Sequence, residues 1–138
     1  MNLKFKKELA DVAKLSAKYN ETETQIKVYN SSLVDAKNYV SEVDVIVCNP
    51  PYFKKGSGKI NQSSSKSLAR HELSITLEDI FKTANDILKR GGSLYFIHII
   101  EREKEMQKLA KKYEFEEKKK LILEGNKLVR FLIKYTKK

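Results

Sequence analysis

Residues 43–52 read VDVIVCNPPY, and this stretch decides the fold. It begins as a largely apolar run rich in β-branched side chains, which is typical of a strand buried on both faces of a parallel sheet. Pro50 and Pro51 stop the strand, because proline cannot donate a ladder hydrogen bond and pushes the preceding residue towards extended geometry. The pattern therefore places Asn49 at the carboxyl edge of the sheet, where open α/β sheets bind ligands.

The four residues Asn49, Pro50, Pro51 and Tyr52 suit the chemistry of a conjugated amino group. Such an amine is a poor nucleophile because its lone pair is delocalised. The Asn49 side-chain oxygen and the Pro50 carbonyl can each accept one N–H bond, which draws the nitrogen towards tetrahedral geometry. The rigid Pro-Pro presents Tyr52, whose ring offers a face for stacking a flipped-out base. An ordinary strand followed by a proline turn is the alternative, and the buried strand before the motif counts against it.

The stretch from Asp44 to Phe53 resembles motif IV of the S-adenosylmethionine-dependent amino methyltransferases. Its continuation is more specific, with KKGSG at 54–58, ARHEL at 69–73 and LEDI at 77–80. This series resembles the bacterial tRNA(Val) adenine-N6 methyltransferases, which modify an anticodon-loop adenine. A DNA adenine or a release-factor glutamine is an alternative target for the Asn-Pro-Pro-Tyr motif alone.

The resemblance covers nearly the whole chain and is strongest from Val43 to Ile97. It implies an α/β fold: a partial class I, Rossmann-like methyltransferase sheet with flanking helices, a C-terminal antiparallel hairpin and the first strands absent. Residues 1–138 would then form a single, truncated methyltransferase domain. The chain would lack its N-terminal cofactor half as a fragment, a truncated gene product or the result of a mis-set start codon.

The resemblance also implies a set of functional residues. Catalytic roles fall on Asn49, Pro50, Pro51 and Tyr52, cofactor contacts on Asn30, Ser32 and Asn49, and nucleic-acid contacts on Tyr52, Phe53, Lys54, Lys55, Lys59 and Arg70. The last group lies mostly in a long irregular segment, roughly 53–75, whose basic side chains could hold phosphates. A solvated linker is the alternative interpretation of that segment.

The cofactor half is where the sequence departs from the family. The family's first strand ends in a glycine-rich turn, its second strand ends in an acidic residue, and an Asp is usual near Ser32. Here the glycines are 56, 58, 91, 92 and 125, and all of them follow the central strand. We therefore expect weak or absent binding of S-adenosylmethionine by this chain.

The composition is consistent with a polyanionic partner. Lys and Arg number 28 against 18 Asp and Glu, giving a net charge of +10 over 138 residues. A lysine-rich solvated surface is the alternative. Cys48 is the lone cysteine, which favours a reducing, cytoplasmic location, and two histidines with one cysteine do not predict a metal site. No run reaches transmembrane length and no signal peptide is recognisable, so a membrane partner is not expected.

Periodicity and turn signals predict the remaining elements. We expect strands over residues 25–29, 94–100, 115–123 and 127–136. Helices are expected over 4–19, ending near Asn20, and over 101–113, with a short helix or turn over 33–40. A further helix is expected to start at a Thr76–Asp79 capping box and to end at Gly91-Gly92, with Lys89 and Arg90 in its last turn. His98 is expected to be a core histidine, and Glu124-Gly125-Asn126 a hairpin turn.

Two functions follow as hypotheses. The first is S-adenosylmethionine-dependent methylation of an adenine exocyclic amine (N6) in tRNA, incomplete in this chain as written. The alternative is a non-catalytic relic that binds RNA or a protein partner. Loss of the first strands would expose sheet edges, which predicts self-association as a further alternative.

Overall fold

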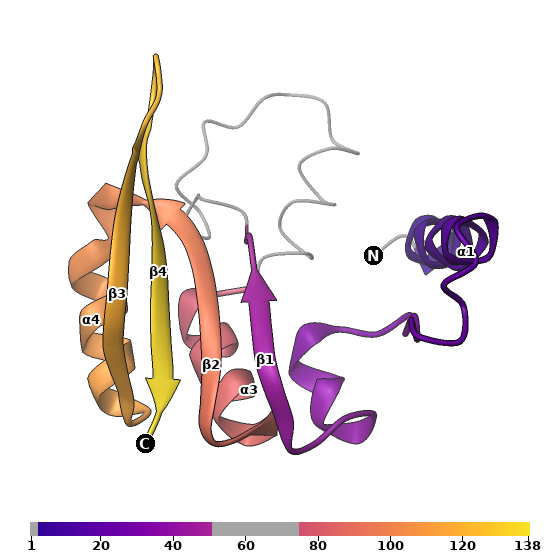
Figure 1. Ribbon diagram of the computed structural model, residues 1–138, viewed down its shortest axis with the longest axis horizontal. Coiled ribbons are helices and arrows are strands. Elements are labelled where there is room, and N and C mark those ends of the chain that lie inside the picture. Colours follow the sequence, from indigo (N-terminus) through magenta and orange to yellow (C-terminus); the bar gives the residue numbers. More distant parts are fainter. Residues whose placement is uncertain (1–2, 51–74) are drawn as a thin grey trace. The chain divides into compact units, whose positions relative to one another are not determined.

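The computed structural model describes residues 3–50 and 75–138, which fall into two compact units. The described part of the first unit ends at Ser32 and contains helix α1 (Leu3–Tyr19). The second unit begins at Leu33 and contains the sheet and its helices (Figure 1). Each unit is described by itself, and a single domain over residues 1–138 stays a prediction.

Helix α1 confirms the predicted helix over 4–19 and ends in a hydrogen-bonded Schellman turn. The Thr22 N–H donates to Ala17 O (2.8 Å) and the Glu21 N–H donates to Lys18 O (3.0 Å), with Glu21 in the left-handed region at φ 54°. The Asn20 side chain donates to Ser16 O at 2.8 Å, as expected for a residue at the helix end.

The predicted strand over 25–29 is wrong. The N–H groups of Gln25 and Ile26 both donate to Thr22 O at 2.9 Å, so the chain turns there instead. A strand requires a neighbour to satisfy its backbone, and the only sheet in the described part of the chain does not include these residues. Alternation in the sequence indicated the side-chain pattern of a strand but could not supply its partner.

In its described residues, the second unit contains a four-stranded sheet and two α-helices (Figure 1). Its elements in chain order are the short 3-10 helix η1 (Leu33–Asn38), β1 (Val43–Cys48), α3 (Leu77–Ile87), β2 (Leu88–Ile99), the 3-10 turn η2 (Ile100–Arg102), α4 (Glu103–Lys112), β3 (Phe115–Glu124) and β4 (Val129–Lys137). The strand order is β1-β2-β4-β3, with β1 parallel to β2 and the other pairs antiparallel. The predicted C-terminal hairpin is confirmed.

The core lies between one face of this sheet and the two helices, which both lie behind the sheet in Figure 1. Phe81 of α3 is fully buried at its centre, with ring centroids 5.8 Å from Phe96, 5.8 Å from Phe115 and 5.3 Å from Tyr135. These contacts join α3 to β2, β3 and β4. Burying aromatic rings of this size stabilises the unit more than any surface ion pair does.

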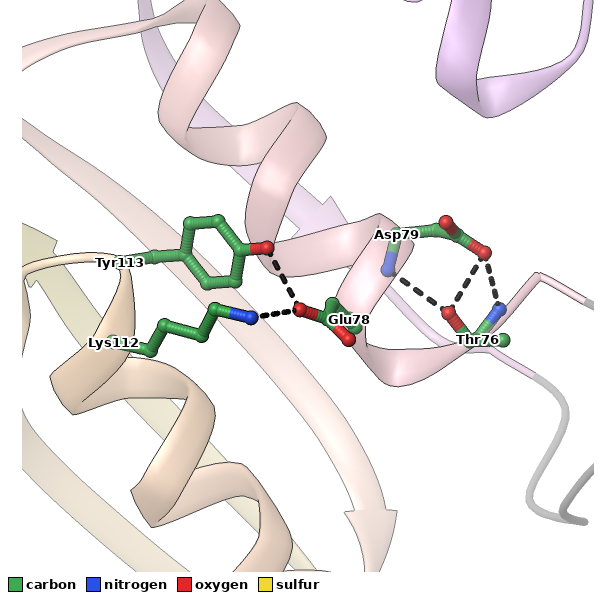
Figure 2. Close-up of polar contacts among 5 residues, drawn as sticks. All are labelled: Thr76, Glu78, Asp79, Lys112 and Tyr113. Atoms are coloured by element: carbon green, nitrogen blue, oxygen red, sulfur yellow. Dashed lines mark hydrogen bonds and ion pairs between the residues drawn. The ribbon is translucent and has the colours of Figure 1, made fainter.

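Helix α3 starts as predicted, with reciprocal hydrogen bonds between Thr76 and Asp79 (Figure 2). Its predicted end is wrong, because the helix stops at Ile87 and Gly91-Gly92 lies within β2. The Lys137 ammonium donates to Asn85 O and to Leu88 O (2.7 Å), so it takes the position at the negative helix end that the sequence suggested for Lys89 and Arg90.

Lys89 forms an ion pair with Asp44, and the two glycines serve the pairing of β1 with β2. Gly91 has φ +78°, a conformation that favours glycine. A Cβ on Gly92 would stand 2.8 Å from Lys89 O and 3.2 Å from Asp44 O, so only glycine lets the two strands approach here.

Strand β1 is parallel as predicted, but the prediction that both its faces are buried is wrong. It pairs only with β2 among the described strands, so it forms an edge. Ile46 and Cys48 face the core, whereas Val45 and Val47 lie on the other face and are 53% and 78% exposed. We call that other face, which α3 and α4 do not cover, the open face of the sheet.

Within residues 3–50 and 75–138, no helix is both long and apolar enough to span a membrane.

Candidate active site

Asn49 lies immediately beyond the carboxyl end of β1, as the sequence predicted. Strand β1 is held by parallel pairing with β2, in which Val47 is opposite Tyr95 and Cys48 is opposite Phe96. Asn49 is exposed and the following Pro50 is buried. The buried proline therefore anchors the backbone next to an exposed residue at the carboxyl end of the strand, the edge at which open α/β sheets bind ligands. Its catalytic role stays a prediction.

His98 lies two residues beyond Phe96 on β2 and is fully buried, which confirms its assignment to the core. Its Nδ1 accepts a hydrogen bond from the Ile99 N–H at 2.9 Å. Burial, and secondarily the Arg102 charge, lower the pKa of His98, so the ring is neutral at physiological pH. His98 is thus a buried, neutral side chain that contacts the backbone at the end of its own strand.

Arg102 and Glu105 form a bidentate ion pair just after β2 ends. The Arg102 Nε donates to Glu105 Oε2 at 2.7 Å and Nη2 donates to Oε1 at 2.9 Å. This fork geometry fixes the turn η2 against the first turn of α4. On β1, burial raises the pKa of the Cys48 thiol, so Cys48 is a packing residue rather than a nucleophile.

Apart from Pro50, the other predicted site residues lie either in the first unit or outside the described residues. Asn30 is exposed and Ser32 is half-buried, and both belong to the first unit. The Ser31 hydroxyl donates to Ser32 O at 3.0 Å. Outside the described residues lie the predicted catalytic and nucleic-acid contacts Pro51, Tyr52, Phe53, Lys54, Lys55, Lys59 and Arg70.

One polar cluster was missed by the sequence reasoning. Glu78 of α3 accepts hydrogen bonds from Lys112 Nζ and from Tyr113 Oη (2.9 Å), which ties the start of α3 to the end of α4 (Figure 2). The Lys112 hydrogen bond lowers the pKa of Glu78. The partners are more than 30 residues apart in sequence, so no local pattern could have indicated the contact.

The fold agrees with comparisons to known proteins. The family profile described as "Methyltransferase small domain" matches residues 5–124. The chain belongs to this methyltransferase family. A solved structure described as TrmN from Thermus thermophilus superposes with a TM-score of 0.61 at 18% identity, over 92% of this chain and 32% of that one, and shows the same fold.

The curated relatives carry a more specific name. A protein of Histophilus somni named tRNA1(Val) (adenine(37)-N6)-methyltransferase is 33% identical over 106 residues, which are 73% of this chain and 44% of the relative. A protein of Bacteroides thetaiotaomicron with the same name is 41% identical over 54 residues, 39% of this chain and 22% of that protein. The chain thus spans less than half the length of these relatives.

Proposed function

We propose that this chain carries the base-handling part of an enzyme that methylates the exocyclic N6 amine of an adenine in tRNA. The observation that carries the proposal is the exposed Asn49 directly after a parallel strand, held by the buried Pro50 and followed by Pro51 and Tyr52. The names of the curated relatives support adenine in tRNA over a DNA base or a protein amide. The setting would be the cytoplasm, where the lone Cys48 stays reduced.

In this proposal, Asn49, Pro50 and Tyr52 act on the adenine and its amine rather than on the methyl donor. The Asn49 Oδ1 and the Pro50 carbonyl would each accept one N–H of the adenine amine, so the nitrogen lone pair becomes available for attack. The proton would leave the nitrogen after the new N–C bond has formed. Tyr52 would stack on the flipped base and hold it in place.

S-adenosylmethionine is the donor that this function requires, since it supplies an electrophilic methyl group. The residues of this chain do not make a full site for it. No carboxylate occurs within Asn30–Ser32, and the sequence has no glycine before Gly56. The cofactor contacts would therefore come from chain beyond these 138 residues.

The test uses a protein in which residues 1–138 follow the cofactor-binding half of a curated relative. Single-turnover methyl transfer to tRNA should be nearly abolished by Asn49→Ala, with little change in RNA affinity, because the amide acts most strongly on the transition state. Asn38→Ala, an exposed amide at the end of η1, is the matched control and should leave the rate unchanged. Transfer at the wild-type rate by Asn49→Ala would refute the assigned role.

A second candidate is a binding protein without catalysis. Among the described strands β1 has a neighbour on one side only, and Val45 and Val47 are exposed on its face, which favours association with another polypeptide or a second copy through strand pairing. Sedimentation of the isolated chain separates the candidates: a monomer with no affinity for other chains argues against this one.

A further inference from the structure

The two faces of the β3–β4 hairpin differ in charge. One face of the hairpin is on the side of the helices. By strand register, Glu117 lies opposite Tyr135 and Glu124 lies opposite Val129 on that face. Lys120 is on the same face and forms an ion pair with Glu103 of α4. Lys119, Arg130 and Lys134 lie on the open face, and none of the three forms an ion pair with a described residue. Glu116 shares that face, but its carboxylate is bound by Lys118 at 2.8 Å. We call Lys119, Arg130 and Lys134 the hairpin cation cluster.

Two members of the hairpin cation cluster oppose each other. Lys119 and Lys134 are directly paired across β3 and β4, an arrangement of like charges that destabilises a sheet. The Lys134 ammonium lies 5.6 Å from the centre of the Tyr95 ring, which partly compensates its charge, whereas Lys119 is exposed. A polyanion bound to both ammonium groups would offset this repulsion.

The cluster is continuous with the candidate active site. One cross-strand row runs Lys119, Lys134, Tyr95 and Val47, from β3 through β4 and β2 to β1. Asn49 follows Val47 by two residues, and Figure 1 shows the hairpin extending past the sheet at the end where β1 and β2 finish. At ~4.8 Å between strands, β3 lies about 14 Å from β1, or roughly four nucleotides of a stacked strand at ~3.4 Å each.

We propose that the open face of the β3–β4 hairpin binds the RNA backbone that flanks the target adenine, with phosphates on Lys119, Lys134 and Arg130. This proposal rests on the proposed function in taking RNA as the substrate. Charge complementarity selects the occupant, because a second copy of a chain with net charge +10 would bring cations against cations on this face. The hairpin would thus require substrates that continue several nucleotides beyond the adenine.

The test measures affinity of the whole chain for a fluorescein-labelled RNA hairpin with adenine in its loop, across a range of salt concentrations. The double variant Lys119→Gln with Lys134→Gln is compared with Lys104→Gln with Lys108→Gln, which removes the same charge from exposed positions on α4. Each lost phosphate contact flattens the slope of log affinity against log salt by about 0.7 for a single strand, so the hairpin variant should lose about 1.4. Relative to wild type, the hairpin variant should therefore lose roughly 25-fold more affinity at 0.1 M salt than at 1 M salt.

The control variant should match wild type within about twofold. Equal slopes for the two double variants would overturn the proposal and leave an acidic protein or solvent as the occupant of this face. Thermal melting provides a second measurement, since Lys119→Gln alone removes the like-charge pair and should keep or raise the melting temperature while weakening RNA binding. A flatter slope for this chain, together with no adenine methylation by its fusion to the cofactor-binding half of a curated relative, would retain this proposal and refute the proposed function.

Discussion

Replacing Tyr135 with Phe should stabilise this protein, although Tyr135 is among its most buried residues. The ring is 1% exposed and packs against Phe81, and the hydroxyl has no hydrogen-bond partner among the described residues. Burying a hydroxyl without a partner costs about 1–3 kcal/mol. Removing the oxygen forfeits a few van der Waals contacts at ~0.1–0.2 kcal/mol each. The net expectation is a gain of roughly 0.5–2 kcal/mol in the free energy of unfolding.

Urea denaturation is the assay, read as a higher midpoint at an unchanged slope. Tyr113→Phe is the matched control, because the Tyr113 hydroxyl donates to Glu78 and its removal should destabilise slightly, with the opposite sign. A loss of more than about 1 kcal/mol in Tyr135→Phe would refute the reasoning, since a loss of that size indicates a satisfied hydroxyl.

The pH dependence of the free energy of unfolding tests the burial of the Tyr135 hydroxyl independently. Burial, with the Glu117 and Glu103 charges as smaller causes, raises the pKa of Tyr135 well above the ordinary value of about 10. The folded protein therefore holds this proton more tightly than the unfolded chain does. The contribution of Tyr135 ionisation to the free energy of unfolding is constant below pH ~10, and the free energy of unfolding falls as the pH rises above that value. Tyr135→Phe should remove that part of the alkaline loss. An unchanged alkaline profile in the variant would contradict the assignment.

Three further predictions concern other parts of the chain. Gly92→Ala should destabilise by ~1–3 kcal/mol in urea titrations through the clash with Lys89 O, and Gly125→Ala, whose nearest contact is 3.2 Å, should cost less. Lys137→Met should lower the free energy of unfolding by about 1–2 kcal/mol through loss of the cap on α3, whereas a Met at the exposed Lys138 should not. Calorimetric titration should find S-adenosylmethionine binding to this chain at least about a hundredfold weaker than to a complete enzyme, and micromolar binding would contradict this.

The sequence predicted elements whose signals are local. The capping box at Thr76 and Asp79, the helices over 4–19 and 101–113, and the C-terminal hairpin all depend on residues close together in the chain, and all are confirmed. The site was predicted only where a motif marked it: the position of Asn49 is confirmed, whereas the roles of Tyr52 and its basic neighbours stay predictions.

Two of the wrong predictions, the burial of both faces of β1 and the end of α3, depend on residues that are distant in sequence. The burial of β1 required strands on both sides and helices on both faces, and neither can be read from VDVIVC itself. The end of α3 was assigned to Gly91-Gly92 because glycine pairs commonly end helices. The cap is instead Lys137, 49 residues beyond Leu88. Gly91 adopts a positive φ, and Gly92 leaves room for Lys89 O and for Asp44 O of β1.

The strand order has a consequence for how the protein is made on the ribosome. Strand β4 follows β3 in the chain, yet it lies between β2 and β3 in the sheet. During synthesis, β3 cannot join the sheet and α3 lacks its Lys137 cap until β4 has left the exit tunnel. The second unit is therefore expected to complete its folding only after β4 has been made, because β2 and β3 depend on β4 for their hydrogen bonds within the sheet.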